Sequence, residues 1–293
     1  MSSLKTATSY QLDKSPLYGV RGKGQFERAL GVSWAQTEKL LKPRYYRQWT
    51  TAKDRLIQQP LFELKAVHNR IAALLSRIEL PDYVYSQKYR SHLDNAEQHR
   101  GLVPLIKTDV NGFFQSISRP MVYRMLQERF ACAKDIAARL ADICCFEQRH
   151  LPTGSSLSGY VAFFAAQPLF DQLAKTCHDR GCKMTLYVDD LTVSGGSANP
   201  ELLLALRSAI RYFGLRTRDG KSMAFREQQP KPVTGAIVIG ERLALPNKHH
   251  LRLWEAKRAF TSTPAAGRPA LARTIIGREL HAQQILARQE HSQ

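Results

Sequence analysis

The 293-residue sequence has no run of about 20 apolar residues, the length that a helix needs to cross a membrane. Its first residues also lack the long apolar segment of a secretory signal peptide, so we expect a cytoplasmic protein without a membrane partner. Acidic residues are scarce as well: 25 Asp and Glu stand against 43 Lys and Arg, and the net charge is +18. A basic surplus of this size favours a polyanionic partner, most often nucleic acid, over a merely soluble basic protein.

Cysteine is rare too, with five residues at positions 132, 144, 145, 177 and 182. The number is odd and two of the cysteines are adjacent, so the set fits neither a disulfide framework nor the spacing of zinc ligands. We therefore expect reduced thiols that act as small core residues. The sequence also lacks internal repeats and low-complexity segments, and its length suits one large domain or two to three small subdomains around a shared core.

The apolar residues follow the spacing of helices and strands. Intervals of three and four predict an amphipathic helix over 61–79, and a short apolar run predicts a buried strand over 102–107. The rest of the expected order is a set of helices beginning near 119, over 134–147, over 157–177 and between Asn199 and Gly214, short strands at 215–217 and 223–226, a hairpin of 233–239 and 242–245, and helical segments over 247–289.

Two segments combine a basic charge with features that suit nucleic acid. Residues 42–55 interleave Lys and Arg with aromatic side chains, a composition suited to backbone phosphates and exposed bases, although a solvated loop before a helix is the competing interpretation. Residues 241–293 hold nine Lys or Arg against four Glu. A helical module of that sign suits an RNA–DNA duplex, and a plain solvated helix pair is the alternative.

Three aspartates lie where a buried strand ends. Asp109 follows the first predicted strand, and Asp189 and Asp190 form the turn between strands 183–188 and 191–194. A carboxylate at such a position is costly to desolvate unless it is paired or holds a metal, and a divalent cation relieves the repulsion between adjacent acids. Two Mg²⁺ ions with oxygen ligands would suit nucleotidyl transfer. We expect Asp109 and Asp189 to bridge the metals and Asp190 to support one of them; a hydrophilic hairpin turn is the alternative.

The same aspartates carry a family resemblance. Tyr187-Val188-Asp189-Asp190 resembles the signature of reverse transcriptases, and the segment from Asp109 to Ile117 resembles the first catalytic segment of the bacterial enzymes. The resemblance implies RNA-templated DNA synthesis from deoxynucleoside triphosphates with two Mg²⁺. It also implies an α+β right-hand polymerase fold, with fingers, a palm of antiparallel sheet backed by helices, and a small helical thumb. The expected division is a helical leader over 1–50, intermixed fingers and palm over 51–240, and the thumb over 241–293.

The resemblance also suggests roles for residues around the three aspartates. Phe114 would take the place of the bulky residue that excludes a ribose 2′-hydroxyl, although Phe113 and Phe114 are adjacent and at least one is expected in the core. Lys221 would face the triphosphate, with a solvated surface lysine as the alternative. The remaining implied metal, nucleotide or template contacts are the Val110 backbone, Arg55, Lys65, Gly154 and Ser155.

Two further segments resemble elements typical of retron reverse transcriptases. Asn95-Ala96-Glu97-Gln98-His99 and Val233-Thr234-Gly235 stand in the expected order around the palm. They imply RNA contacts at Asn95, His99, Val233, Thr234 and Gly235.

Retron membership implies further biology. The enzyme would copy part of a cognate structured non-coding RNA into short single-stranded DNA, primed from an RNA 2′-hydroxyl, and retain the RNA–DNA product. Retrons act in phage defence, here with a separate effector protein. The alternatives are a non-retron bacterial defence or group II intron-like reverse transcriptase, and an RNA-dependent scaffold that restrains a toxic effector.

The resemblance has departures. Thr153 stands where the loop after Pro152 usually carries Gln, and Arg218 stands where an Asn often precedes the palm lysine. These changes leave the metal ligands in place, and they concern nucleotide selectivity and template placement.

Overall fold

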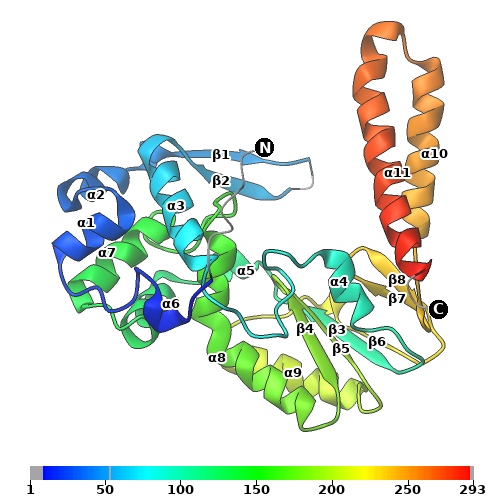
Figure 1. Cartoon of the computed structure of the whole chain (residues 1–293), viewed down its shortest axis with the longest axis horizontal. Helices are drawn as coiled ribbons and strands as arrows, with labels where there is room; N and C mark the ends of the chain where they lie inside the picture. Colours follow the sequence, from blue (N-terminus) through cyan, green and yellow to red (C-terminus); the bar gives the residue numbers. More distant parts are fainter. Residues whose placement is uncertain (1–8, 53, 291–293) are drawn as a thin grey trace. The chain divides into compact units, whose positions relative to one another are not determined.

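The computed structural model describes residues 9–52 and 54–290 (Figure 1). The first eight residues of the predicted leader, and Lys53 within the basic stretch 42–55, lie outside the described residues. Contacts divide the chain into two compact units. The first unit comprises Met1–Pro81, Val110–Gln172 and Phe213–Leu215, and the second comprises Asp82–Asp109, Leu173–Tyr212 and Arg216–Gln293. The predicted division at residues 50 and 240 stays a prediction.

The first unit is mainly helical, and a β-hairpin belongs to it. Its largest fully buried side chains include Phe26, Phe130 and Phe164, and the rings of Phe130 and Phe164 pack edge to face with their centroids 5.5 Å apart. The predicted helix over 61–79 is confirmed, but it ends at Leu75. The elements are α1 (Lys23–Leu30), α2 (Trp34–Leu40), β1 (Tyr46–Thr50), β2 (Leu56–Pro60), α3 (Phe62–Leu75), α5 (Phe113–Ser116), α6 (Arg119–Arg124), the π-helical turn Met125–Arg129, α7 (Lys134–Cys144) and the first part of α8 (Ser158–His178).

The hairpin of β1 and β2 was missed in the sequence, where residues up to 50 were expected to be helical. The two strands pair antiparallel, with Trp49 opposite Ile57. Strand β1 is exposed along most of its length, so its sequence lacks the apolar alternation that reveals a half-buried strand.

A four-stranded antiparallel sheet forms the centre of the second unit, with strand order β4-β5-β3-β6. Strand β3 is buried along nearly its whole length, and α9 packs against it. The strands predicted from the apolar runs are confirmed, except that 215–217 form none. The elements are β3 (Leu105–Asp109), β4 (Lys183–Tyr187), β5 (Asp190–Ser194), α9 (Pro200–Tyr212), the 3₁₀ turn Asp219–Lys221 and β6 (Met223–Phe225).

A second, three-stranded sheet of β7 (Lys231–Val233), β8 (Ala236–Ile239) and β9 (Arg242–Ala244) lies in the same unit. The sequence predicted one hairpin here, with a single strand over 233–239. That strand is interrupted because Thr234 and Gly235 have φ angles of +38° and +96°, which turn the chain between β7 and β8.

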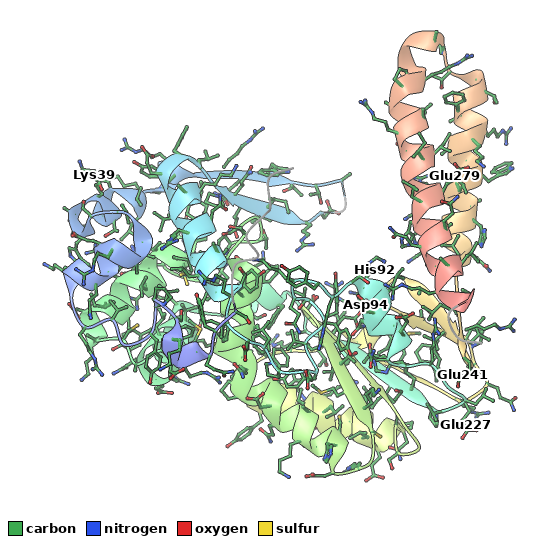
Figure 2. All side chains as sticks on the ribbon, in the orientation of Figure 1. Lys39, His92, Asp94, Glu227, Glu241 and Glu279 are labelled. Carbon is green, nitrogen blue, oxygen red and sulfur yellow. The ribbon has the colours of Figure 1, made fainter. Side chains whose placement is uncertain are left out.

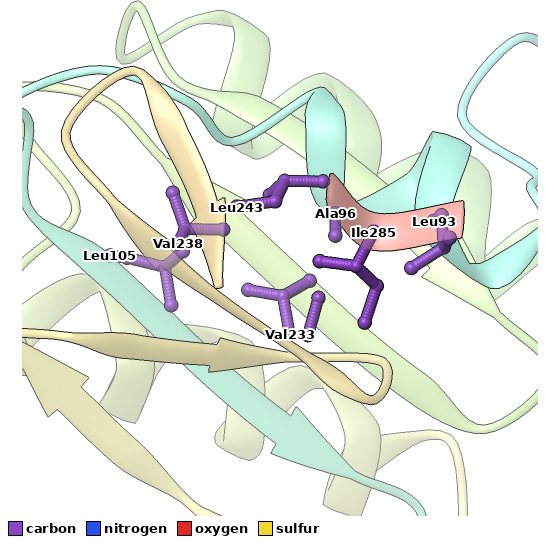
Figure 3. Close-up of a cluster of buried hydrophobic side chains, with 8 residues drawn as sticks. Leu93, Ala96, Leu105, Val233, Val238, Leu243 and Ile285 are labelled. Carbon is purple, nitrogen blue, oxygen red and sulfur yellow. The ribbon is translucent and has the colours of Figure 1, made fainter. Parts of the chain in front are cut away.

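The chain then forms an antiparallel pair of long helices, α10 (Asn247–Ser262) and α11 (Arg268–Glu290) (Figure 1). Ile285 of α11 is fully buried in an apolar cluster with α4 (His92–Glu97), β3 and the three-stranded sheet (Figure 3). Figure 2 shows His92 and Asp94 on α4; the His92 ring stacks on His281 of α11, and Asp94 pairs with Arg288. These contacts attach α11 to α4 within the second unit.

All five cysteines are free and buried, which confirms the prediction of core thiols. Burial raises the pKa of Cys132 to about 11 and that of Cys177 to about 12, so both remain protonated at neutral pH. In residues 9–52 and 54–290, no helix has the length and apolar character needed to cross a bilayer.

Candidate active site

Sheet pairing brings the predicted carboxylates to one end of the palm sheet. Asp109, the last residue of β3, lies opposite Asp190 of β5, and Asp190 in turn lies opposite Tyr187 of β4. Only Val188 and Asp189 connect β4 to β5, so Asp189 is fixed at the tip of this turn. Val188 has a φ angle of +61°, which is costly for a β-branched residue. Such strain is often found at functional sites.

The environment of these carboxylates disfavours a concentration of negative charge. Burial raises the pKa of Asp189, and the neighbouring Asp109 carboxylate raises it further. Burial also raises the pKa of Asp190, an effect that Lys107 opposes and Asp109 reinforces. The site therefore favours a cation that would hold Asp189 and Asp190 ionised.

Two side-chain cations approach Asp109. The Lys221 ammonium forms an ion pair with Asp109 Oδ2, and Arg218 Nε lies 4.0 Å from Oδ1. The Arg218 backbone N–H also donates to the Asp109 carbonyl oxygen at 3.0 Å. Asp109 is only 4% exposed, whereas about half of each basic side chain is exposed. Asp109 is thus buried beside two cations that face solvent.

The residues of this site fit a hard divalent cation. Asp109 Oδ1 and Asp190 Oδ1 are buried and have no hydrogen-bond partner in the described part of the chain. Carboxylate oxygens are the ligands that Mg²⁺ prefers. Within that same part, the three carboxylates do not form a preformed three-ligand cluster. Lys221 instead pairs with one oxygen of Asp109, so the metal would take over that oxygen from the lysine.

The loop after Pro152 is bound to β2 within the first unit. Gly154 donates its N–H to Gln58 O at 3.1 Å, and a Cβ atom on Gly154 would lie 2.9 Å from that same oxygen. Thr153 Oγ1 donates to Leu56 O at 2.6 Å and accepts from the Gln58 N–H at 3.2 Å. The threonine that departs from the family pattern therefore helps to attach the loop to the strand.

The other predicted nucleotide or template residues of the first unit differ in exposure. Ser155 Oγ lies 2.7 Å from Nδ1 of the buried His68, so its hydroxyl is already engaged. Arg55 and Lys65 are exposed and available to a ligand. Phe113 is buried against the ring of Phe170, which confirms that one of the two adjacent phenylalanines belongs to the core, and Phe114 is half-buried. The predicted roles of these residues stay predictions.

The two retron-like elements are in direct contact. Asn95 Nδ2 donates to Thr234 Oγ1 at 3.2 Å, and Thr234 Oγ1 donates to His92 O at 2.6 Å. Asn95, His99 and Val233 are fully buried, whereas Thr234 is half-buried and Gly235 is exposed. The buried side chains have no surface with which to touch RNA here, so for them the geometry favours a role in positioning the element. Direct RNA contact stays a prediction.

His99 connects this element to the β4–β5 hairpin that carries Asp189. Its Nδ1 lies 2.7 Å from Ser194 Oγ on β5, and its Nε2 lies 2.7 Å from Thr185 Oγ1 on β4. Burial lowers the pKa of His99 to about 3, with a further contribution from Lys183. The imidazole is therefore neutral at physiological pH, and it binds both strands that carry the Val188–Asp189 turn.

Sequence reasoning missed Lys107 and underrated Arg218. Lys107 and Asp109 are two residues apart on one strand, so their side chains leave the same face, and this alternation was the available signal. Arg218 was noted only as a departure from the usual Asn, yet its backbone and side chain both approach Asp109.

Comparison with known proteins bears on this site. A family model described as reverse transcriptase (RNA-dependent DNA polymerase) matches residues 41–238, more than half of the chain and all three aspartates. The chain belongs to this family. The expected α+β right-hand polymerase fold is confirmed. Telomerase from Candida albicans, solved with a fragment of telomeric RNA, shares the fold with a TM-score of 0.51 at 11% identity, over 73% of this chain and 50% of the telomerase chain.

Curated relatives confirm the predicted resemblance to retron enzymes. The Escherichia coli retron Ec86 reverse transcriptase is 27% identical over 68% of this chain and 65% of the relative. The retron Ec83 enzyme of the same species is 25% identical over 80% and 81% of the two chains, and the retron Ec48 enzyme is 26% identical over 68% and 53%. The match thus spans slightly less than two thirds of the Ec86 enzyme and about half of the Ec48 enzyme.

Proposed function

We propose that this protein is an RNA-directed DNA polymerase that extends a primer with deoxynucleoside triphosphates on an RNA template. The observation that carries the proposal is the register of the palm sheet, which pairs Asp109 with Asp190. Each of these residues has a buried oxygen without a hydrogen-bond partner among the described residues. Asp109, Asp189 and Asp190 would hold two Mg²⁺ ions, with the Val110 backbone as a further ligand.

The chain's own groups then divide the work. Bound metal ions would stabilise the attacking primer 3′-hydroxyl and the departing pyrophosphate. The pairing of β3, β4 and β5 in one sheet fixes the backbone of Asp109 and of the Val188–Asp189 turn, and this orients the three carboxylates. Lys221 and Arg218 place positive charge beside Asp109, suited to the negative charge that develops on pyrophosphate. Phe114 is proposed to discriminate against the 2′-hydroxyl, and Arg55, Lys65, Gly154 and Ser155 to contact nucleotide or template.

Primer extension on a synthetic RNA template tests the activity. Asp189→Asn keeps the size of the side chain and removes its charge, so extension should fall by more than about a hundredfold, the scale of several kcal/mol of transition-state stabilisation. Asp179→Asn is the matched control, since Asp179 is an exposed aspartate paired with Lys175 after α8. Extension by the Asp189 variant at the unchanged rate would overturn the assignment.

We further propose a retron function: copying part of a cognate non-coding RNA from a 2′-hydroxyl primer, retaining the RNA–DNA product, and acting in phage defence in the cytoplasm with a separate effector. The retron relatives and the contact between Asn95 and Thr234 support this proposal. Nucleic acid extracted from protein purified from its native host should contain one discrete short DNA linked to RNA. A non-retron reverse transcriptase would yield no such species.

A scaffold that restrains a toxic effector is the second candidate. The Asp189→Asn variant separates the two functions. Effector restraint that survives without DNA synthesis would support the scaffold, whereas loss of restraint together with synthesis would support a role for the DNA product.

A further inference from the structure

A loop of residues 82–91, here called the edge loop, covers the free edge of the palm sheet. Strand β4 is the outermost strand of that sheet, and Val84 forms a parallel bridge with its residue Leu186. The Tyr85 N–H donates to Leu186 O at 2.8 Å, and the Leu186 N–H donates to Tyr83 O at 2.7 Å. The edge loop is therefore attached to β4 only three residues before Asp189.

Polar contacts within the edge loop hold it closed. One guanidinium nitrogen of Arg90 donates to Asp82 O at 2.6 Å and to Val84 O at 3.0 Å. The Arg90 guanidinium also lies over the Tyr85 ring, 4.6 Å from its centroid. Gln87 Nε2 donates to Val84 O at 2.7 Å. These bonds join the two ends of the loop, so its tip is presented in a defined position.

Tyr89 lies in a turn that is closed by a hydrogen bond of 3.3 Å from the Arg90 N–H to Gln87 O. Its φ angle is +66°, which disfavours any residue with a Cβ atom, and its side chain is 88% exposed. The backbone is strained and the ring gains no burial in return. Covering the sheet edge explains the segment from Tyr83 to Tyr85, but it does not require an aromatic residue at position 89. The turn accounts for the positive φ angle, but glycine would adopt that angle at lower cost, so an exposed tyrosine at this position is a candidate functional residue.

We propose that Tyr89 is a stacking platform for an unpaired base of the RNA template, and that Lys88 contacts the phosphate beside that base. An aromatic face stacks on any base, which suits an enzyme that must move along its template. Lys88 is exposed next to Tyr89, and the chain carries a net charge of +18. Because the edge loop is already closed, binding orders little additional chain. This inference rests on the proposed polymerase function.

Binding of a primer–template with a single-stranded RNA overhang that contains 2-aminopurine tests the proposal. Tyr89→Gly removes the ring and relieves the backbone, so affinity should fall about five- to tenfold while thermal stability is kept or raised. Tyr89→Phe keeps the ring and should bind within about twofold of the wild type. Tyr212→Ala is the control, because Tyr212 is 96% exposed at the end of α9 in the same unit. Lys88→Met should reduce the slope of log affinity against log salt by about one.

The outcomes separate this inference from the proposed function. If the wild type extends primers and Tyr89→Gly binds the overhang as tightly as the wild type does, the stacking role is wrong and the polymerase function stands. The same result would be expected if the exposed ring served a protein partner instead. If the wild type neither binds nor extends any primer–template, the proposed function itself fails. Weakening in both Tyr89→Gly and Tyr212→Ala would also contradict a specific platform.

Discussion

Between pH 7.5 and pH 5, protonation of His99 in the unfolded chain should lower the free energy of unfolding of the second unit by about 2 kcal/mol. Replacing His99 with Gln should abolish this loss. His99 is fully buried between Thr185 and Ser194, and its pKa is lowered from 6.5 to about 3, first by burial and then by Lys183. Below pH 6.5 the unfolded chain binds a proton that the folded protein excludes. The contribution of the neutral, buried His99 to the free energy of unfolding is therefore complete above pH 6.5, and it is lost as the pH falls toward 3.

The magnitude follows from the linkage between proton binding and folding. Each pH unit below 6.5 costs about 1.4 kcal/mol, so at pH 5 the wild type has lost about 2 kcal/mol through His99. The glutamine side chain of the variant does not titrate, and it retains one donor and one acceptor for the two hydroxyls. Imperfect hydrogen bonds should still destabilise the variant by about 1–3 kcal/mol at pH 7.5. The stability difference between wild type and variant should thus shrink by about 2 kcal/mol from pH 7.5 to pH 5.

Hydrogen exchange in peptides that cover β4 and β5 is the suitable assay, because it reports on opening of the second unit alone. Exchange rates must be corrected for the intrinsic effect of pH. His178→Gln is the matched control, since His178 ends α8 within the second unit and its side chain is 91% exposed. A difference between wild type and the His99 variant that stays constant from pH 7.5 to pH 5 would refute the reasoning.

Three further predictions follow from single contacts. Lys221→Met removes the cation that competes with a metal ion for Asp109, so Mn²⁺ affinity, measured by electron paramagnetic resonance, should rise about two- to fivefold. Lys175→Met, at an exposed lysine, is the control and should leave the affinity unchanged. An unchanged or lower affinity in the Lys221 variant would contradict the competition. Gly154→Ala places a methyl group 2.9 Å from Gln58 O and should destabilise the first unit by about 1–3 kcal/mol in denaturant titrations, whereas Gly159→Ala, with open space around it, should not. Arg288→Met breaks the ion pairs to Asp94 and Glu97 of α4, which are 2.7 and 2.6 Å long, and should lower the free energy of unfolding by about 1 kcal/mol. Proteolysis in α10 and α11 should then be faster. An unchanged rate would show that the apolar cluster alone holds these helices.

The three carboxylates could be located from the sequence because strand periodicity is a local signal. Asp109 and the Asp189-Asp190 pair each end an apolar run, and antiparallel pairing of those runs is enough to bring Asp109 opposite Asp190. Burial of His99 could not be predicted in the same way. Its partners Thr185 and Ser194 are 86 and 95 residues away, and its local sequence is polar on both sides. A histidine that looks available in the sequence is thus enclosed by distant strands.

Exposure at the tip of the edge loop was equally hidden in the sequence. Tyr89 lies among other tyrosines and basic residues, and only its positive φ angle and its 88% exposure distinguish it from Tyr85, which packs under Arg90. The β1–β2 hairpin was missed for a related reason: its exposed strand has no apolar alternation. Sequence patterns report which residues favour burial, and they report poorly on polar segments whose conformation is fixed by hydrogen bonds to other strands.

His99 connects the retron-like element to the Val188–Asp189 turn. One imidazole bonds to β4 and β5 at once, and the same element reaches Thr234 through Asn95. A movement of α4 that displaced His99 would therefore leave two buried hydroxyls unpaired in the strands that carry Asp189 and Asp190, at a cost of about 1–3 kcal/mol for each hydroxyl. RNA bound at the exposed Gly235 side of this element would favour the arrangement with those bonds intact only if it bound that arrangement more tightly. The hydrogen bonds of these buried residues thus connect Thr234, beside the exposed Gly235, to the strands that carry Asp189 and Asp190, which is a physical reason for their identity apart from any contact with RNA.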